Sequence, residues 1–240
     1  MTVKQLKEEI QVKDQFIALL AHDLRNPIGL LKNFSDLLLE DVNKYSEKEI
    51  KEKLSFINDL SNNTFNLLEN LILWLQSHNG NITFKGSVCD LDTIFKESLT
   101  SIKNQAEIKN IKIYPTLKGS IKVYTDTNIL CTVLRNLLSN AIKYSFEGGK
   151  IELSYKASGN KLTIEIKDHG TGIKQSELDS ILSTGKSTDS KRGTNGETGT
   201  GIGLNLCKTL SKELNGRLWG KSEINKGTSM FVSIPLLTDK

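Results

Sequence analysis

Residue types that can do chemistry first come together in the stretch HDLRNP, where His22 stands next to Asp23 and four residues before Asn26. An imidazole beside a carboxylate is a candidate nucleophile, because the carboxylate orients one ring nitrogen and raises the nucleophilicity of the other. A histidine on a solvated helix face is by itself usually only a surface residue. The role of His22 therefore depends on what the rest of the chain supplies.

A second stretch, RNLLSNAIKYS, contains two amides and a lysine with helical spacing. Asn136 and Asn140 are four residues apart on one face of an expected helix, and Lys143 follows one turn later. Amide oxygens can complete a magnesium shell whose other ligands are phosphate and water, and a lysine there can hold phosphate charge. This pattern makes the two amides candidate ligands of Mg²⁺.

Two glycine-rich stretches complete the set. In DHGTGI, Asp168 ends an expected strand and can accept a hydrogen bond from an exocyclic amine, while Gly170 and Gly172 let backbone approach a flat ring. In GTGIGL, backbone N–H groups at a helix start suit phosphate. Each pattern alone is weak, and GTGIGL lacks the preceding strand and βαβ frame of a dinucleotide site.

The histidine lies on an expected helix with a heptad seam. Apolar residues recur in steps of three and four from Val3 to Leu38. This register places His22 at position f, which points away from the partner helix. Pro27 lies inside the helix, where it supplies no N–H, so a kink is expected.

A second long helix is expected to open at the capping box SEKE, from Ser46 to Glu49, and to end near His78. Two long helices with a short connection predict an antiparallel hairpin. One hairpin buries each apolar seam on one side only. Two hairpins in a homodimeric four-helix bundle are therefore favoured over a lone hairpin packed on the following domain.

Turn residues at Asn79–Asn81 place a domain boundary between residues 80 and 81. Beyond it, helices alternate with short strands, and Ser158-Gly159-Asn160 predicts a β-hairpin. Helices are expected at 91–109, 126–144 and up to residue 214, and strands at 111–115, 121–124, 150–157, 161–168, 217–223 and 228–236. This order predicts an α+β sandwich with one long loop, residues 183–203.

Composition narrows the function classes. The 240 residues suffice for one or two domains, and 32 Lys+Arg against 28 Asp+Glu give no argument for nucleic acid. Three widely spaced cysteines fit a reducing, cytoplasmic setting. No apolar run approaches the roughly 20 residues that a membrane span needs. The seam already runs from Val3, so a longer natural protein could continue upstream and carry a membrane anchor there.

In this order, the motifs resemble those of the transmitter core of sensor histidine kinases. HDLRNP resembles the H box, RNLLSNAIKYS the N box, DHGTGI and GTGIGL the two glycine boxes, and KGTSMFV the last Gly-Thr element. The resemblance implies a dimerisation and phosphoacceptor hairpin of HisKA type with an upstream coiled-coil extension, residues 1–80. It further implies a Bergerat-type ATP-binding domain of the GHKL superfamily, residues 81–240. The phenylalanine-rich lid box is here ILSTGKSTDSKRG, which lacks phenylalanine.

The resemblance also implies residue roles. His22 would accept the γ-phosphoryl of Mg-ATP, Asp23 would act as its general base and orienter, and Asn26 would serve phosphatase and phosphotransfer steps. The partner would be a response-regulator receiver domain, whose aspartate takes the phosphoryl group. The implied ATP-binding residues are Asn136, Asn140, Lys143, Tyr144, Asp168, Gly170, Gly172, Ile173, Gly199, Thr200, Gly201, Gly203, Leu204 and Thr228.

One position separates branches of this superfamily. Its ATPases carry a glutamate four residues before the magnesium asparagine, where this chain has Asn136, an amide that cannot act as a base. Hydrolysis to water is therefore expected to be slow. An ATP hydrolase remains the first alternative, and a non-catalytic scaffold that binds regulators through the four-helix bundle remains the second.

Overall fold

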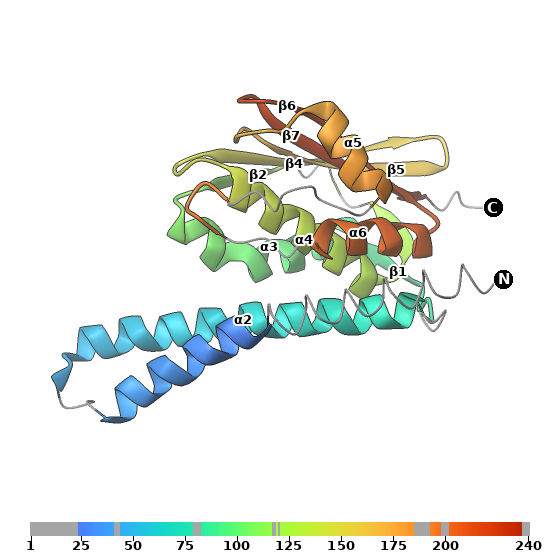
Figure 1. Ribbon diagram of the computed structural model, residues 1–240. Helices are drawn as coiled ribbons and strands as arrows, with labels where there is room; N and C mark the ends of the chain where they lie inside the picture. Colours follow the sequence, from blue (N-terminus) through green and yellow to red (C-terminus); the bar gives the residue numbers. More distant parts are fainter. Residues whose placement is uncertain are drawn as a thin grey trace, which may run out of the picture. The chain divides into compact units, whose positions relative to one another are not determined.

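The computed structural model describes residues 24–40, 44–78, 83–116, 119, 121–184, 193–197 and 202–236 (Figure 1). The chain divides into two compact units, Met1–Leu73 and Trp74–Lys240. His22 and Asp23 lie outside the described residues. The domain boundary between residues 80 and 81 stays a prediction. No described helix is both long enough and apolar enough to cross a bilayer.

The N-terminal unit contains a helix of residues 24–40, which continues through Pro27, and most of α2 (Glu47–His78). The capping box is present: the Ser46 N–H donates to Glu49 Oε2 over 2.8 Å, and the Glu49 N–H donates back to Ser46 Oγ over 3.3 Å. The two helices run in opposite directions (Figure 1), and the rings of Phe34 and Phe56 lie 4.6 Å apart. The two helices therefore pack as a hairpin.

The second unit contains two sheets and four helices within the described residues. Five strands form one sheet in the order β2-β4-β5-β7-β6, antiparallel except for the parallel pair β2 and β4. A separate antiparallel pair joins β1 and β3. The strands are β1 (Ser87–Asp90), β2 (Lys112–Pro115), β3 (Lys122–Thr125), β4 (Lys150–Ser158), β5 (Lys161–Asp168), β6 (Arg217–Glu223) and β7 (Gly227–Pro235). The helices are α3 (Leu91–Ile108), α4 (Thr127–Tyr144), α5 (Gln175–Thr184) and α6 (Ile202–Glu213).

The core lies between the large sheet and the layer of α3, α4 and α6 beneath it in Figure 1. Every second residue is buried in β5 and in β4 from Ile151 to Tyr155, as expected for strands with one face toward a core. From α4, Leu130, Val133, Leu134 and Leu138 are fully buried. The predicted α+β sandwich is confirmed for this unit, including its mostly antiparallel sheet.

Two elements were not expected from the sequence. Strand β1 has four residues with no alternating pattern, and its pairing with β3 across the chain stabilises it. Helix α5 lies between β5 and the expected long loop, in a stretch where the sequence predicted no element; its polar sequence has one buried apolar residue, Leu178. Both elements depend on tertiary contacts rather than on local sequence signals.

Candidate functional site

Helix α4 positions the amides of the second motif. Asp126 caps its start, because Oδ1 accepts a hydrogen bond of 3.2 Å from the Ile129 N–H. The apolar side of the helix is buried in the core. Asn136, Asn140 and Lys143 are half-buried, as expected for the side of α4 at the edge of that core.

The Asn136 amide is fixed within α4 and lies close to the fourth motif. Its Nδ2 donates to the Thr132 carbonyl over 2.9 Å. A Cβ added to Gly203, in the first turn of α6, would lie 3.1 Å from Asn136 Oδ1. A glycine at that position therefore lets α6 approach the amide closely. Leu204, the next residue of α6, is half-buried.

Asp168, at the end of β5, is 5% exposed. Its Oδ1 accepts the Gly170 N–H at 2.9 Å and the Thr228 N–H at 3.2 Å. Burial raises the pKa of Asp168, while these N–H groups act in the opposite direction. The carboxylate thus joins the loop after β5 to the start of β7.

An open hollow of about 330 Å³ lies beside this carboxylate. Most of its lining is polar, and it comes from β5, the hairpin of β6 and β7, and the start of α5, with no residue of α4. Its lining residues are Lys167, Asp168, Gln175, Lys221, Ser222, Glu223, Lys226, Gly227, Thr228 and Ser229.

The two glycines of DHGTGI allow close backbone packing. A Cβ on Gly170 would overlap the carbonyl oxygen of Tyr144, and the Thr171 N–H donates to that oxygen over 3.0 Å. Gly172 has φ +56°, and a Cβ there would overlap the carbonyl oxygen of Glu223. The loop after β5 therefore lies directly against the end of α4, which brings the second and third motifs together.

Ser222 was missed by the sequence reasoning. Its Oγ accepts the Ile173 N–H over 2.9 Å and lies 2.8 Å from Thr228 Oγ1. It thereby links β6 to two predicted site residues. A serine in a strand carries no motif signal, so only the fold could reveal it.

Lys143 and Tyr144 interact at the end of α4. Lys143 Nζ lies 4.9 Å from the centre of the Tyr144 ring. Burial lowers the pKa of Lys143 and raises that of Tyr144. The nearby Glu197 carboxylate raises both pKa values, so it partly offsets the effect of burial on Lys143 and adds to it on Tyr144.

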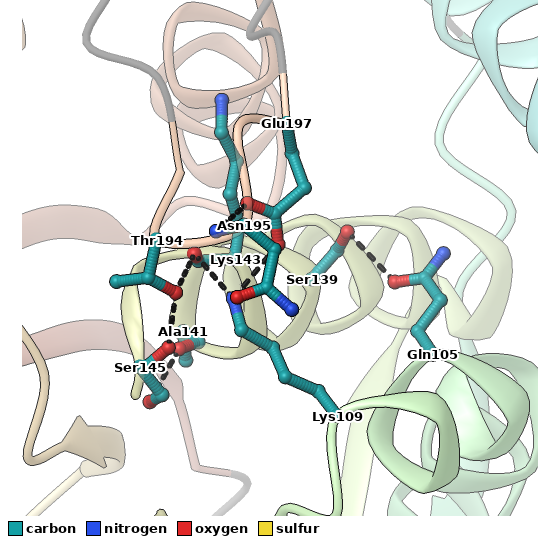
Figure 2. A network of polar contacts seen from close by, with 9 residues as sticks. All are labelled: Gln105, Lys109, Ser139, Ala141, Lys143, Ser145, Thr194, Asn195 and Glu197. Carbon is teal, nitrogen blue, oxygen red and sulfur yellow. Dashed lines mark hydrogen bonds and ion pairs between the residues drawn. The ribbon is translucent and has the colours of Figure 1, made fainter. Parts of the chain in front are cut away.

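The segment Gly193–Glu197, part of the expected long loop, also contacts the end of α4 (Figure 2). Thr194 donates from Oγ1 to the Ser145 carbonyl over 2.6 Å, and its N–H donates to the Lys143 carbonyl over 3.2 Å. Lys109 and Glu197 form an ion pair of 2.7 Å beside it. None of these residues was a sequence candidate except Lys143.

Several predicted residues are not placed together with this site. Gly199, Thr200 and Gly201 lie outside the described residues, as do His22 and Asp23. Asn26 is exposed on the first helix of the N-terminal unit. Their predicted roles therefore rest on the sequence motifs alone and stay predictions.

The amide oxygens of α4 are donors that fit Mg²⁺. Among the described residues, no three His, Cys, Asp or Glu side chains gather as a metal cluster. A divalent cation would depend on amide oxygens, chiefly that of Asn140, and on phosphate and water. These are the hard oxygen ligands that Mg²⁺ prefers.

Comparison with known proteins agrees with this geometry. Residues 125–238 match the family model described as histidine kinase-, DNA gyrase B-, and HSP90-like ATPase. The sensor protein SrrB of Staphylococcus aureus is 28% identical over 239 residues, which are 98% of this chain and 40% of SrrB. Residues 125–238 carry a domain of this family, and the chain as a whole resembles a sensor histidine kinase. The chain spans about 40% of the length of that curated relative.

Two solved structures are similar to this chain in fold. The histidine kinase ThkA, in complex with the response regulator protein TrrA, has a TM-score of 0.63 and 20% identity, covering 96% of this chain and 64% of that one. Full-length ShkA in complex with AMPPNP has a TM-score of 0.60 and 21% identity, covering 94% of this chain and 46% of that one. The fold therefore extends across both units of the chain.

Proposed function

We propose that this core transfers the γ-phosphoryl group of ATP to His22 and then to an aspartate of a response-regulator receiver domain. The observation that carries the proposal is the convergence of three motifs around Asp168 and the end of α4. The chain that builds this nucleotide site also contains HDLRNP. The AMPPNP complex of ShkA supports ATP as the nucleotide, and the regulator complex of ThkA supports a response regulator as the partner.

Asp168 selects the base in this proposal. Because the Gly170 and Thr228 N–H groups both donate to Oδ1, we assign Oδ2 to the exocyclic amine of adenine. The ring then lies against the glycine-containing backbone of the loop after β5, with Tyr144 flanking it. Burial of the carboxylate strengthens this contact, since hydrogen bonds are stronger in a low-dielectric environment.

The phosphates lie toward α4 and the start of α6. Asn140, with help from Asn136, holds Mg²⁺, which when bound neutralises charge on the phosphate oxygens. Lys143 pairs with the phosphate tail, and the GTGIGL backbone covers it. The protein's task is then mostly positioning, as is general for phosphoryl transfer.

His22 is the nucleophile. Asp23 accepts a hydrogen bond from one ring nitrogen, and the other attacks the γ-phosphorus in line. A nitrogen–phosphorus bond forms, the bond from the γ-phosphorus to the bridging oxygen breaks, and ADP leaves. Transfer to water should be slow, because Asn136 supplies no base to activate it.

The phosphohistidine then passes its phosphoryl group to the receiver aspartate. Asn26, one turn beyond His22, is exposed and available to a docked partner. It is proposed to position water when the receiver's aspartyl phosphate is hydrolysed. Kinase and phosphatase activities would thus share one helix face.

The N-terminal unit is proposed to work as a homodimeric four-helix bundle. Large apolar side chains remain exposed on both helices of a single hairpin, and a second copy would cover them. They are Ile28, Leu30, Leu37, Leu39, Leu54, Phe56, Phe65, Leu68 and Ile72. We propose a cytoplasmic location for this chain, with which its three free cysteines are compatible, and a membrane anchor upstream in the whole protein.

Incubation with γ-labelled ATP and Mg²⁺ tests the proposal. Wild type should acquire acid-labile, base-stable label, and His22→Gln should acquire none. Label that persists on His22→Gln would overturn the assignment. Free labelled phosphate without labelled protein would favour the hydrolase alternative, and nucleotide binding without any transfer would favour the scaffold.

A further inference from the structure

A buried lysine outside all the motifs lies beneath the proposed phosphate site. Lys109, at the end of α3, has a side chain only 3% exposed. Its Nζ donates to the Lys143 carbonyl over 2.8 Å and to Glu197 Oε1 over 2.7 Å (Figure 2). A further bond of 3.0 Å, from Ser139 Oγ to Gln105 Oε1, holds α3 against α4 nearby. The position of Lys109 relative to α4 is therefore well determined.

The two side chains of this ion pair differ strongly in their exposure to water. The Glu197 side chain is 36% exposed, but Lys109 has almost no contact with water. Burial raises the pKa of Glu197, yet the hydrogen bonds from Lys109 and from backbone N–H groups outweigh this and hold the pKa below its ordinary value. Removing the glutamate charge would leave a buried ammonium without its carboxylate, which is a costly state.

Glu197 organises a short turn around this charge. Its Oε2 accepts the Asn195 N–H over 2.8 Å, and its carbonyl accepts the Gly193 N–H over 2.8 Å. A Cβ on Gly193 would lie 2.7 Å from Cγ of Lys143. The turn Gly193–Glu197 thus packs on the stem of the lysine that is proposed to hold phosphate.

We propose that Lys109 and Glu197 are positioning residues that hold the turn Gly193–Glu197 on α4 and thereby direct Lys143 toward the triphosphate of ATP. This inference rests on the proposed function, since it concerns the same nucleotide site. Neither residue touches the nucleotide. They act through the Lys143 carbonyl, through the Thr194 N–H bonded to it, and through the contact of Gly193 with the Lys143 stem.

The pair should affect phosphate binding but not base binding. If Lys143 is misdirected, ATP loses a charged contact and its Kd should rise by about 10-fold. Adenosine, which has no phosphates, should bind the variants as it binds wild type. A merely structural role would weaken both ligands together, so the ratio of the two affinities separates positioning from general damage.

The test uses the full chain and the variants Lys109→Met and Glu197→Gln. Glu197→Gln keeps the shape of the side chain, so it remains informative if Lys109→Met does not fold. Glu107→Gln is the matched control, because it removes an exposed pair, Lys103 with Glu107 at 3.7 Å, from the same helix end. Amide hydrogen exchange of residues 193–197 is measured without nucleotide, and ATP and adenosine then compete with a fluorescent ATP analogue.

We expect faster amide exchange at residues 193–197 in Glu197→Gln but not in Glu107→Gln. We also expect Glu197→Gln to lose affinity for ATP but not for adenosine. Unchanged exchange would overturn the proposed hold on the turn. Faster exchange with an unchanged ATP-to-adenosine ratio would overturn the link to phosphate binding. A wild-type protein that binds neither ligand would instead overturn the proposed function, and the exchange data would still decide whether the pair holds the turn.

Discussion

Replacing Asp168 by asparagine is expected to change the base preference of the nucleotide site. Two backbone N–H groups, of Gly170 and Thr228, point at Oδ1. Only an oxygen can accept both, so the variant amide must place its oxygen there and its NH₂ group where Oδ2 was. Adenine would then meet a donor where it now meets an acceptor.

The expected change in the Kd for ATP follows from the negative charge of the Asp168 carboxylate. A hydrogen bond to a charged partner contributes about 1.5–3 kcal/mol, so the Kd for ATP should rise by roughly 10- to 150-fold. GTP, whose base carries a carbonyl in place of the amine, should gain affinity. Competition of ATP and GTP with a fluorescent nucleotide measures both changes, and Asp36→Asn, at an exposed position of the first helix, is the control. If Asp168→Asn kept the preference for ATP over GTP, the assignment of Oδ2 to the base would be wrong.

The same substitution has a pH signature in stability. Burial raises the pKa of Asp168, so the folded state holds this proton more tightly than the unfolded state does. Wild type should therefore lose stability from this group as pH rises from the ordinary aspartate pKa through the raised one. Asp168→Asn lacks the proton, so its stability relative to wild type should increase with pH across that window in thermal unfolding.

Other predictions concern single contacts. Asn140→Ala should lose labelling from γ-labelled ATP while sedimentation still shows the proposed homodimer; a monomeric variant would contradict the separation of dimerisation and nucleotide binding into two modules. Gly170→Ala should lower the free energy of unfolding, measured in urea, by about 1–3 kcal/mol, because its Cβ overlaps the Tyr144 carbonyl. Gly159→Ala should lower it less, because Gly159 has φ +55° but open space around it. Burial raises the pKa of Cys131 to about 11, so its alkylation should be slow at pH 8 and accelerate toward pH 11; rapid reaction at pH 8 would contradict this burial.

The elements that sequence reasoning found are those with local causes. The α4 cap at Asp126, the capping box at Ser46 and the hairpin of β4 and β5 each depend on residues a few positions apart. Strand β1 depends on β3, more than thirty positions away, and has no pattern of its own. Local signals therefore predicted the sandwich but not its small second sheet.

The site divides in the same way. Asn136 and Asp168 belong to motifs whose chemistry is readable from short spacings, whereas Thr228 is implied by the family resemblance. Lys109 and Glu197 are 88 positions apart, and in the sequence each resembles an ordinary surface charge. Only the packing of α3 on α4 shows that the lysine is buried and that the glutamate compensates it. Residues that support a site are thus harder to predict than residues that touch the ligand.

The geometry at residue 136 bears on where the phosphoryl group can go. Its Nδ2 is engaged by the Thr132 carbonyl, which turns Oδ1 toward Gly203 and the start of α6. An amide oxygen held there can face a cation or a water molecule, but it cannot take a proton from that water. A site that binds ATP without activating water preserves the γ-phosphoryl group until a nucleophile arrives. A histidine oriented by its own carboxylate, as His22 and Asp23 are proposed to be, supplies the activation that position 136 lacks.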